Sequence, residues 1–441
     1  MKSLHAFQLH FLLKSIILIT FVEALFLAVT EIIDFKYFYL FVILLNLHLV
    51  YRVRHNTFFL VFFVFSTFYA VSLIPKFFYH LDISIYSSFN ETHIYYTTFI
   101  AHSIFILVLY TFLPRSLSLK NSVYRLKLPA NTNFLGFFVM FFICVLILVK
   151  AQSGQTIFQA EGYSTGESSK SPLYLYFLIF FLLTYYYSTR SGVQLWLIVL
   201  LAITYSIKSV LYGSRTEVMQ LGILSFYLLK IDNKIRISNF TLFIGLIFLY
   251  YLNLVFANIR DNPFGILQGQ YAEILNPLKF IDNTRGIVIS NEGDVFQSSA
   301  RMVGMVKYGY IDLLSRSISF FGFLLSILVP VSYLPAEASL ITYKQDVFVS
   351  GGGGLITAYF YCWFGFLGPA LAALVVIWIA KLSLKRHLAL TGKLYLLMVF
   401  STFLQWFAYN PLILFKLCFW VIPIVCISNF LLKSIFVRKS T

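Results

Sequence analysis

Long apolar segments recur from one end of the chain to the other, and they constrain its fold more than any other feature. The segments 12–30 and 412–432 are each about as long as the ~20 residues that a helix needs to cross a bilayer. Of the 441 residues, 60% are hydrophobic and only 11% are charged, against about 25% charged in an average soluble domain. This composition excludes a soluble enzyme, a nucleic-acid-binding domain and a disordered chain. It predicts an all-α polytopic membrane protein.

Apolar runs, and the turn or charge clusters between them, predict about twelve transmembrane helices. The predicted spans are 12–30, 37–51, 57–75, 94–113, 132–149, 172–188, 193–211, 217–229, 239–257, 358–380, 394–409 and 412–432. The sequence therefore predicts three parts. These are helices 1–9 in residues 1–257, a large loop in 258–357, and helices 10–12 in 358–441.

The distribution of Lys and Arg predicts the orientation of these helices. The chain has 33 basic and 17 acidic residues, a net charge of +16. If the N-terminus is cytoplasmic, the cytoplasmic segments hold 19 basic residues with Asp232 as their only acid. Because cytoplasmic loops collect Lys and Arg, we expect both termini in the cytoplasm and the large loop outside. The basic N-terminus is not followed by a small-residue cleavage site, so we expect an uncleaved first span.

The large loop is unusually long for a connector, and such connectors usually carry function. Within it, Ile318–Leu334 is apolar enough to resemble a further span. It contains Pro330, however, and a thirteenth span would place the basic segment 381–386 outside. Before it, Val303, Val306, Tyr310 and Leu313 are expected to share one face of a helix. We therefore predict interfacial or re-entrant helices within the external loop.

Charged residues in and near the loop are the candidate site. Arg215 follows a Gly-Ser break between the seventh and eighth spans, where a charge near the membrane is costly. An ordinary interfacial turn, with Arg215 paired to Glu217 or reaching the headgroups, is the alternative. The loop itself contributes the cations Arg260, Arg285, Arg301 and Arg316 and the carboxylates Glu273, Glu292 and Asp294. The alternative is that these residues are ordinary surface charges of a solvated loop.

Glycines 351–354 end the loop, and Tyr359 follows them. Gly352 and Gly353 would let the backbone approach a ligand closely, although a flexible hinge explains them equally well. No Gly-Lys-Ser/Thr follows them, so they do not form a phosphate-binding loop. The four cysteines lie in apolar stretches without metal-ligand spacing, and the loop contains no histidine. We therefore expect neither a metal nor another cofactor, and no nucleic-acid partner.

These features occur in an order that resembles the O-antigen polymerases, the Wzy-type oligosaccharide repeat unit polymerases. The resemblance rests on the many spans, the Gly213-Ser214-Arg215 turn and the single large loop that closes with Asp346 and the four glycines. An aromatic, glycine-punctuated segment from Tyr359 to Gly368 then enters the next span. The resemblance covers essentially the whole chain and is firmest over about residues 205–370.

The resemblance implies a GT-C-like glycosyltransferase of the bacterial inner membrane that acts on the periplasmic face. It would polymerise undecaprenyl-diphosphate-linked oligosaccharide repeat units into O-antigen or a related surface polysaccharide, in lipopolysaccharide or polysaccharide biosynthesis. Its implied partners are these lipid-linked glycans, membrane lipids and a chain-length regulator. The diphosphate and the rest of the substrate would be bound by Arg215, Arg260, Arg285, Arg301, Arg316, Gly352, Gly353 and Tyr359. The candidate catalytic bases are Glu292, Asp294 and Glu273.

Two other functions remain open. An O-antigen ligase has similar spans and a large loop, but a loop histidine often features in that family. A flippase or transporter of lipid-linked oligosaccharides would also need many spans and cationic cavity residues. A transporter is expected to have two comparable halves, whereas here one half carries the large loop.

Overall fold

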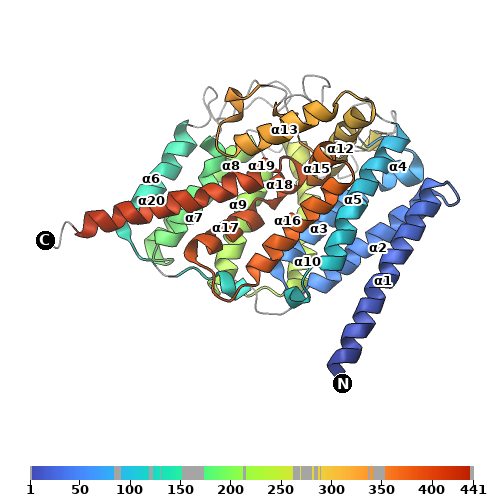
Figure 1. The fold of residues 1–441 in the computed structure, drawn as a ribbon. Coiled ribbons are helices and arrows are strands. Elements are labelled where there is room, and N and C mark those ends of the chain that lie inside the picture. Colours follow the sequence, from blue (N-terminus) through green and yellow to red (C-terminus); the bar gives the residue numbers. More distant parts are fainter. Residues whose placement is uncertain are drawn as a thin grey trace. The chain divides into compact units, whose positions relative to one another are not determined.

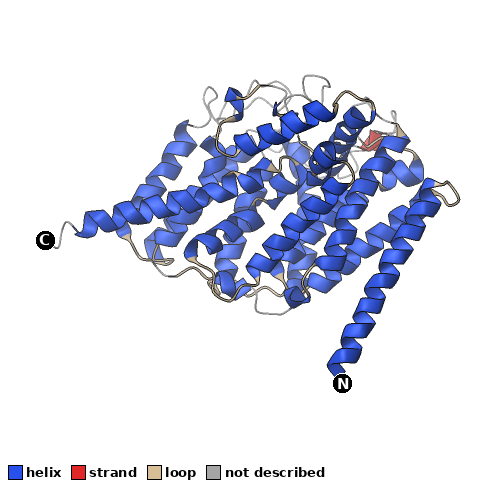
Figure 2. Cartoon of the chain, in the orientation of Figure 1, coloured by secondary structure: helices blue, strands red, loops and turns tan. Residues whose placement is uncertain are grey.

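The structure of the protein is a computed structural model. It describes residues 2–83, 91–118, 123–129, 131–150, 173–211, 215–261, 269, 281–282, 287–288, 290–335, 338–340 and 353–437. Nearly every element among them is a helix (Figure 2). Two short strands, β1 (Ile281–Asp282) and β2 (Ile287–Val288), pair antiparallel with Ile281 opposite Val288. The predicted helical class is therefore confirmed for these residues.

Five helical segments within the described residues are long and apolar enough to cross a membrane. They are Phe35–Val53, Thr57–Tyr79, Thr92–Phe112, Gly192–Ser209 and Leu412–Leu432. Each of the twelve predicted spans falls on one or more helices. The structure thus has the character of a helical membrane protein, and the full set of twelve spans remains a prediction.

The chain divides into two compact units of similar length. The first unit combines Met1–Leu119, Phe280–Leu382 and Ala408–Asn410. The second combines Lys120–Lys279, Ser383–Phe407 and Pro411–Thr441. The predicted loop 258–357 therefore contributes to both units.

The first unit is built around an apolar helix that is buried on every side. This helix, α3, has 13 of its 15 residues buried, as expected for a helix without a polar face. Asn56 caps it by accepting hydrogen bonds from the backbone N–H groups of Phe58 and Phe59. The helices of this unit are α1 (Lys2–Val29), α2 (Phe35–Val53), α3 (Thr57–Val71), α4 (Ile74–Tyr79), α5 (Thr92–Phe112), η1 (Arg115–Ser118), α12 (Asn291–Lys307), α13 (Leu313–Ser326), η5 (Val331–Tyr333), α15 (Ile356–Phe364) and α16 (Leu367–Ser383).

Basic residues of the predicted cytoplasmic side hold the C-terminal end of α5. The guanidinium of Arg52 donates to the carbonyl oxygens of Tyr110 and Leu113 at 2.7 and 2.6 Å. The amine of Lys14 donates to the carbonyl oxygen of Thr111. Cations at this end of a helix satisfy carbonyl groups that lack an intrahelical partner and favour the helix dipole.

In the second unit, α6, α7 and α20 meet at Gly136. A Cβ atom built on Gly136 would lie about 3 Å from side-chain atoms of Tyr187 and Leu432, so this position requires a small residue. The Tyr187 hydroxyl also donates to Asn429 at 2.8 Å. The helices of this unit are η2 (Val123–Leu126), α6 (Phe134–Lys150), α7 (Leu173–Tyr187), α8 (Gly192–Leu211), α9 (Arg215–Ile231), α10 (Asn239–Asp261), α17 (Leu390–Ser401), α18 (Phe403–Ala408), α19 (Leu412–Phe415) and α20 (Leu417–Val437).

The last three predicted spans are each interrupted. The tenth divides into α15 and α16 at Gly365, which adopts a φ of 60°. Gly368 then packs against the backbone of Phe360, where a Cβ atom would lie only 1.9 Å from the carbonyl oxygen. The eleventh divides into α17 and α18, and a separate short helix, α19, begins the twelfth. The overall apolarity of these spans concealed the breaks, although Thr402 and Lys416 lie at the second and the third.

One predicted helical face is wrong. Val303, Val306, Tyr310 and Leu313 do not share a face, because α12 ends at Lys307 and α13 begins at Leu313. Gly309 adopts a left-handed φ of 76°, which ends the first helix. The carboxylate of Asp312 then caps the second by accepting a hydrogen bond from the Ser315 N–H at 2.7 Å. Val303 is consequently buried, whereas Leu313 is 75% exposed.

Helix α13 turns several large apolar side chains away from the rest of the first unit, whereas Phe320 and Phe323 pack against Trp363 of α15. Leu313, Leu314, Phe321 and Leu325 are exposed, whereas its buried residues are Ser319, Gly322 and Ser326. Its 14 residues extend about 21 Å, less than the ~30 Å of a bilayer core. Pro330 follows it, so no continuous helix covers 318–334. These features fit the predicted interfacial helix.

Candidate functional site

Helix α12 is the most polar buried helix in the first unit, and it comes from the predicted loop. Thirteen of its 17 residues are buried, and it packs against α3, α5 and α15. Figure 1 shows α12 near α4 and α13, at one end of this unit's long helices. Ser290 caps its N-terminus by accepting a hydrogen bond from the Gly293 N–H at 2.9 Å. Glu292 and Asp294 occupy its first turn, where carboxylates favour the helix dipole.

The first turn of α12 lies directly against the chain that follows α4. A Cβ atom on Gly293 would lie 2.5 Å from the Ile83 carbonyl oxygen, so only glycine permits this approach. The Glu292 side chain beside it is only 3% exposed. On the same turn, Asn291 accepts a hydrogen bond from the Tyr409 hydroxyl at 2.9 Å. Both candidate bases of this helix therefore belong to a tightly packed part of the unit.

Five polar side chains next to this turn form what we call the charge cluster: Lys76, Asp82, Tyr95, Asp294 and Arg301. The Lys76 amine lies 2.9 Å from an Asp82 carboxylate oxygen and 5.0 Å from the centre of the Tyr95 ring. Tyr95 interacts electrostatically with Asp82, Asp294 and Arg301. The side chain of Lys76 is 7% exposed and that of Arg301 is 1% exposed.

The buried cations of the cluster, Lys76 and Arg301, require compensation inside the unit. An ion moved out of water loses several kcal/mol of hydration, and neighbouring opposite charges and hydrogen bonds restore part of it. The cluster contains two cations and two carboxylates, contributed by α4, the segment after it, and α12. Charged groups inside an apolar helical body are a functional-site hypothesis by default. The cluster is therefore the strongest candidate site in the described part of the first unit.

The end of the glycine run is attached to α12 through hydrogen bonds between two serine side chains and its backbone. Gly353 adopts a φ of 88°, and a Cβ atom there would lie 2.7 Å from the Cα of Tyr409. The Ser298 hydroxyl donates to the Gly353 carbonyl oxygen, and the Leu355 N–H donates to Ser299 at 2.8 Å. Gly353 is thus required for close packing of the backbone. Gly352 lies outside the described residues.

Tyr359 and Arg316 both stabilise α15 and its surroundings. The buried Tyr359 donates its hydroxyl to the Tyr409 carbonyl oxygen at 2.9 Å. The Arg316 Nε donates to the Cys362 carbonyl oxygen at 2.5 Å, near the C-terminal end of α15. Arg316 is partly exposed, and its guanidinium retains further N–H groups for another acceptor.

The remaining predicted site residues lie in the second unit or outside the described residues. Arg215 begins α9 and Arg260 lies in α10, both in the second unit. Glu273 and Arg285 fall outside the described residues. The structure therefore brings together Asp294 and Arg301, with Glu292 on the same helix, and it places Gly353, Tyr359 and Arg316 around α15.

Sequence reasoning missed Lys76, Asp82 and Tyr95. A signal for the first two was present, because Lys76 ends an apolar run directly after Pro75 and Asp82 follows six residues later. Their relation to α12 could not be inferred, since more than 200 residues separate them from Asp294. Across the described ranges, no three His, Cys, Asp or Glu side chains gather as a metal site would require.

Comparisons with known proteins identified no relative of this chain. No protein-family description, no curated protein and no solved structure matches the chain.

Proposed function

We propose that the protein joins undecaprenyl-diphosphate-linked oligosaccharide repeat units into a surface polysaccharide. The proposal rests on the resemblance to O-antigen polymerases and on one structural observation. That observation is the charge cluster, in which the buried cations Lys76 and Arg301 lie with Asp82, Tyr95 and the half-buried Asp294. A structural membrane scaffold has no need to bury so many charges.

The proposed reaction transfers a growing glycan from one lipid diphosphate to the next repeat unit. An acceptor hydroxyl attacks the sugar carbon that carries the diphosphate, and a new glycosidic bond forms. The carbon–oxygen bond to the diphosphate breaks, and polyprenyl diphosphate leaves with the bonding electrons. A carboxylate takes the hydroxyl proton. The reaction needs no nucleotide, because the polyprenyl diphosphate attached to the donor sugar is already the leaving group.

The candidate carboxylates and arginines have separate roles in this scheme. Asp294 or Glu292 in the first turn of α12 accepts the proton, with Glu273 as the third candidate. The positive charge of Arg301 favours ionised carboxylates in the cluster. Arginines stabilise the leaving diphosphate, because a guanidinium matches phosphate oxygens and keeps its charge. These are Arg215, Arg260, Arg285 and Arg316.

The proposed location is the bacterial inner membrane, with twelve spans, both termini in the cytoplasm and the large loop in the periplasm. The support is the charge distribution, in which 19 basic residues and one acid lie on the proposed cytoplasmic side. Within the first unit, the first turn of α12 and the segment after α4 lie together. In this orientation both belong to the periplasmic side, where the lipid-linked sugars are polymerised.

A flippase is the second candidate, and one observation favours it. The chain forms two compact units of similar length, as is common in transporters with two halves. The units are interleaved in the sequence rather than consecutive, which is unlike a simple repeat.

Reconstitution distinguishes the two functions. Purified protein in liposomes is supplied with a synthetic polyprenyl-diphosphate repeat unit, and both chain growth and movement between leaflets are measured. A polymerase yields a ladder of longer lipid-linked glycans without any energy source. Movement between leaflets without chain growth would identify a flippase instead.

A further inference from the structure

We infer that the second unit contains a binding site for the phosphate headgroup of an anionic phospholipid, in a pocket between segment 127–129 and the start of α17. The pocket has a volume of about 400 Å³, within the range of small-molecule sites. Its lining residues are Lys127, Leu128, Pro129, Leu388, Leu390 and Lys393. This inference concerns a site separate from the charge cluster and does not depend on the proposed reaction.

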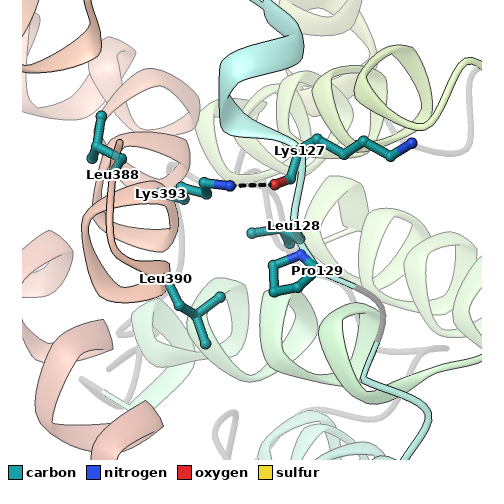
Figure 3. A pocket seen from close by; sticks show the side chains of 6 residues that line it. All are labelled: Lys127, Leu128, Pro129, Leu388, Leu390 and Lys393. Carbon is teal, nitrogen blue, oxygen red and sulfur yellow. Dashed lines mark hydrogen bonds between the residues drawn. The ribbon is translucent and has the colours of Figure 1, made fainter. Parts of the chain in front are cut away.

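Cations hold one wall of the pocket in place. The Lys393 amine donates to the Lys127 carbonyl oxygen at 2.7 Å, as Figure 3 shows. The Arg190 guanidinium donates to the carbonyl oxygens of Leu128 and Pro129 at 3.3 and 2.9 Å. Arg190 is in turn paired with Asp232 at 3.1 Å. Three consecutive carbonyl groups are therefore fixed, and segment 127–129 forms a stable wall.

Lys393 is the cation best placed to bind an anion in the pocket. An ammonium group has three N–H donors, and the bond to Lys127 uses one of them. In Figure 3 the amine of Lys127 points away from Lys393, so Lys393 carries the charge at this wall. Leu390 and Lys393 lie in the first turn of α17, whose N-cap residue Ala389 supplies no side-chain acceptor. The positive end of the helix dipole further favours the binding of an anion at this position.

The charge around the pocket favours an anion over a cation or a neutral ligand. In the described parts of the second unit, the neighbouring segments 123–129, 190, 230–236 and 383–393 contain one acid, Asp232. The same segments contain nine basic residues: Arg125, Lys127, Arg190, Lys230, Lys234, Arg236, Lys385, Arg386 and Lys393. Since Asp232 is paired with Arg190, most of this positive charge remains uncompensated within these segments.

The apolar part of the lining identifies a lipid rather than a free phosphate. Leu128, Pro129, Leu388 and Leu390 supply most of the pocket wall, and a hydrated inorganic anion gains nothing from them. A phospholipid places its phosphate at Lys393 and the start of its acyl chains against the leucines. In the proposed orientation these segments are cytoplasmic, where the membrane surface is rich in anionic lipids.

Native mass spectrometry of the purified full-length protein tests this site with phosphatidylglycerol as the probe and phosphatidylcholine as the reference lipid. Lys393→Gln removes the charge but keeps an N–H donor for the Lys127 carbonyl. Leu390→Trp keeps the charge and fills the pocket. Lys385→Gln is the matched control, because it removes the charge of an exposed lysine in the same segment.

We expect the apparent affinity for phosphatidylglycerol to fall about fivefold in Lys393→Gln and by at least as much in Leu390→Trp. Lys385→Gln should retain nearly the wild-type affinity. Equal effects of Lys393→Gln and Lys385→Gln would overturn the site, as would equal binding of phosphatidylcholine and phosphatidylglycerol. Competition by glycerol phosphate or inorganic phosphate at the same concentration as the lipid would overturn the lipid assignment.

Discussion

At the scale of single residues, Arg301 is the side chain with the largest consequences. It lies on α12 with 1% of its surface exposed and interacts with Tyr95 in the charge cluster. A buried carboxylate is tolerated only while compensating charge and hydrogen bonds surround it. The stability of the first unit is therefore expected to depend on this cation.

Arg301→Met tests this dependence. Methionine fills much of the same volume but removes the charge, and it leaves the rest of the cluster without its second cation. We expect a loss of about 3–5 kcal/mol in the free energy of unfolding, measured by denaturant titration in detergent. Lys307→Met is the control, since Lys307 is an exposed cation on the last turn of the same helix. It should change stability by no more than about 0.5 kcal/mol. Equal losses in both variants would refute a buried charge cluster.

Asp312 provides a test based on pH. Hydrogen bonds from the hydroxyl and the backbone N–H of Ser315 lower the pKa of Asp312 below its usual value. A carboxyl group with a lowered pKa in the folded state stabilises that state above its unfolded pKa of about 4. The cap should therefore weaken only as the pH falls below 4 and through the folded-state pKa.

Hydrogen exchange at residues 313–317, corrected for the intrinsic pH dependence, measures this effect. The protection of the first turn of α13 should fall in the acid range in the wild-type protein. In Asp312→Asn, which keeps a capping oxygen but does not titrate there, the protection should be nearly independent of pH. Equal pH dependence in both proteins would contradict the role of Asp312 as the cap.

At the scale of helices, α13 contacts α15 through Phe320 and Phe323, presents small residues where it is most buried, and carries large apolar residues on its outer face. Gly322 lies on the inner face, where a Cβ atom would be 2.4 Å from the Ala338 backbone. Ser319 on the same face accepts a hydrogen bond from the Trp363 indole at 3.0 Å. The close approach of α13 to the unit thus depends on glycine at position 322.

Gly322→Leu should displace α13 and lower the thermal stability of the protein. Overpacking of this kind typically costs about 1–3 kcal/mol, and the backbone of Ala338 cannot move aside as a flexible side chain would. Ser317→Ala on the exposed face of the same helix is the control. A melting temperature of Gly322→Leu equal to that of Ser317→Ala would show that α13 does not pack as described.

The helices were more predictable from the sequence than their breaks and contacts. Apolar runs identified a helix at every predicted span, because bilayer-length apolarity is a local property. The end of α12 at Gly309 was missed, since the periodic pattern of Val303 and Val306 continues through Tyr310 and Leu313 in the sequence alone. Arg301 was expected in a loop, but its burial depends on α3, α5 and α15, which are distant in sequence. The cluster with Lys76 and Asp82 is likewise a tertiary feature.

At the scale of the whole molecule, the central prediction is the topology. Cysteines placed at Tyr343 and Ser350 should react with a membrane-impermeant reagent from the periplasmic side. They should be protected from reagent on the cytoplasmic side. Native Cys426 is exposed and must first be replaced, whereas Cys144, Cys362 and Cys418 are buried. Labelling from the cytoplasm would mean that residues 318–334 cross the membrane, and it would reverse the orientation of all later helices.

The most direct test of the account compares two carboxylates in the reconstituted polymerisation assay. Asp294 belongs to the charge cluster, whereas Asp312 lies on the same connector and only caps α13. If Asp294 acts in proton transfer, Asp294→Asn should lower the rate of chain growth by about 100-fold or more, compared at equal amounts of folded protein. Asp312→Asn should grow chains at nearly the wild-type rate. Chain growth by Asp294→Asn at the rate of Asp312→Asn would contradict the proposed role of the cluster.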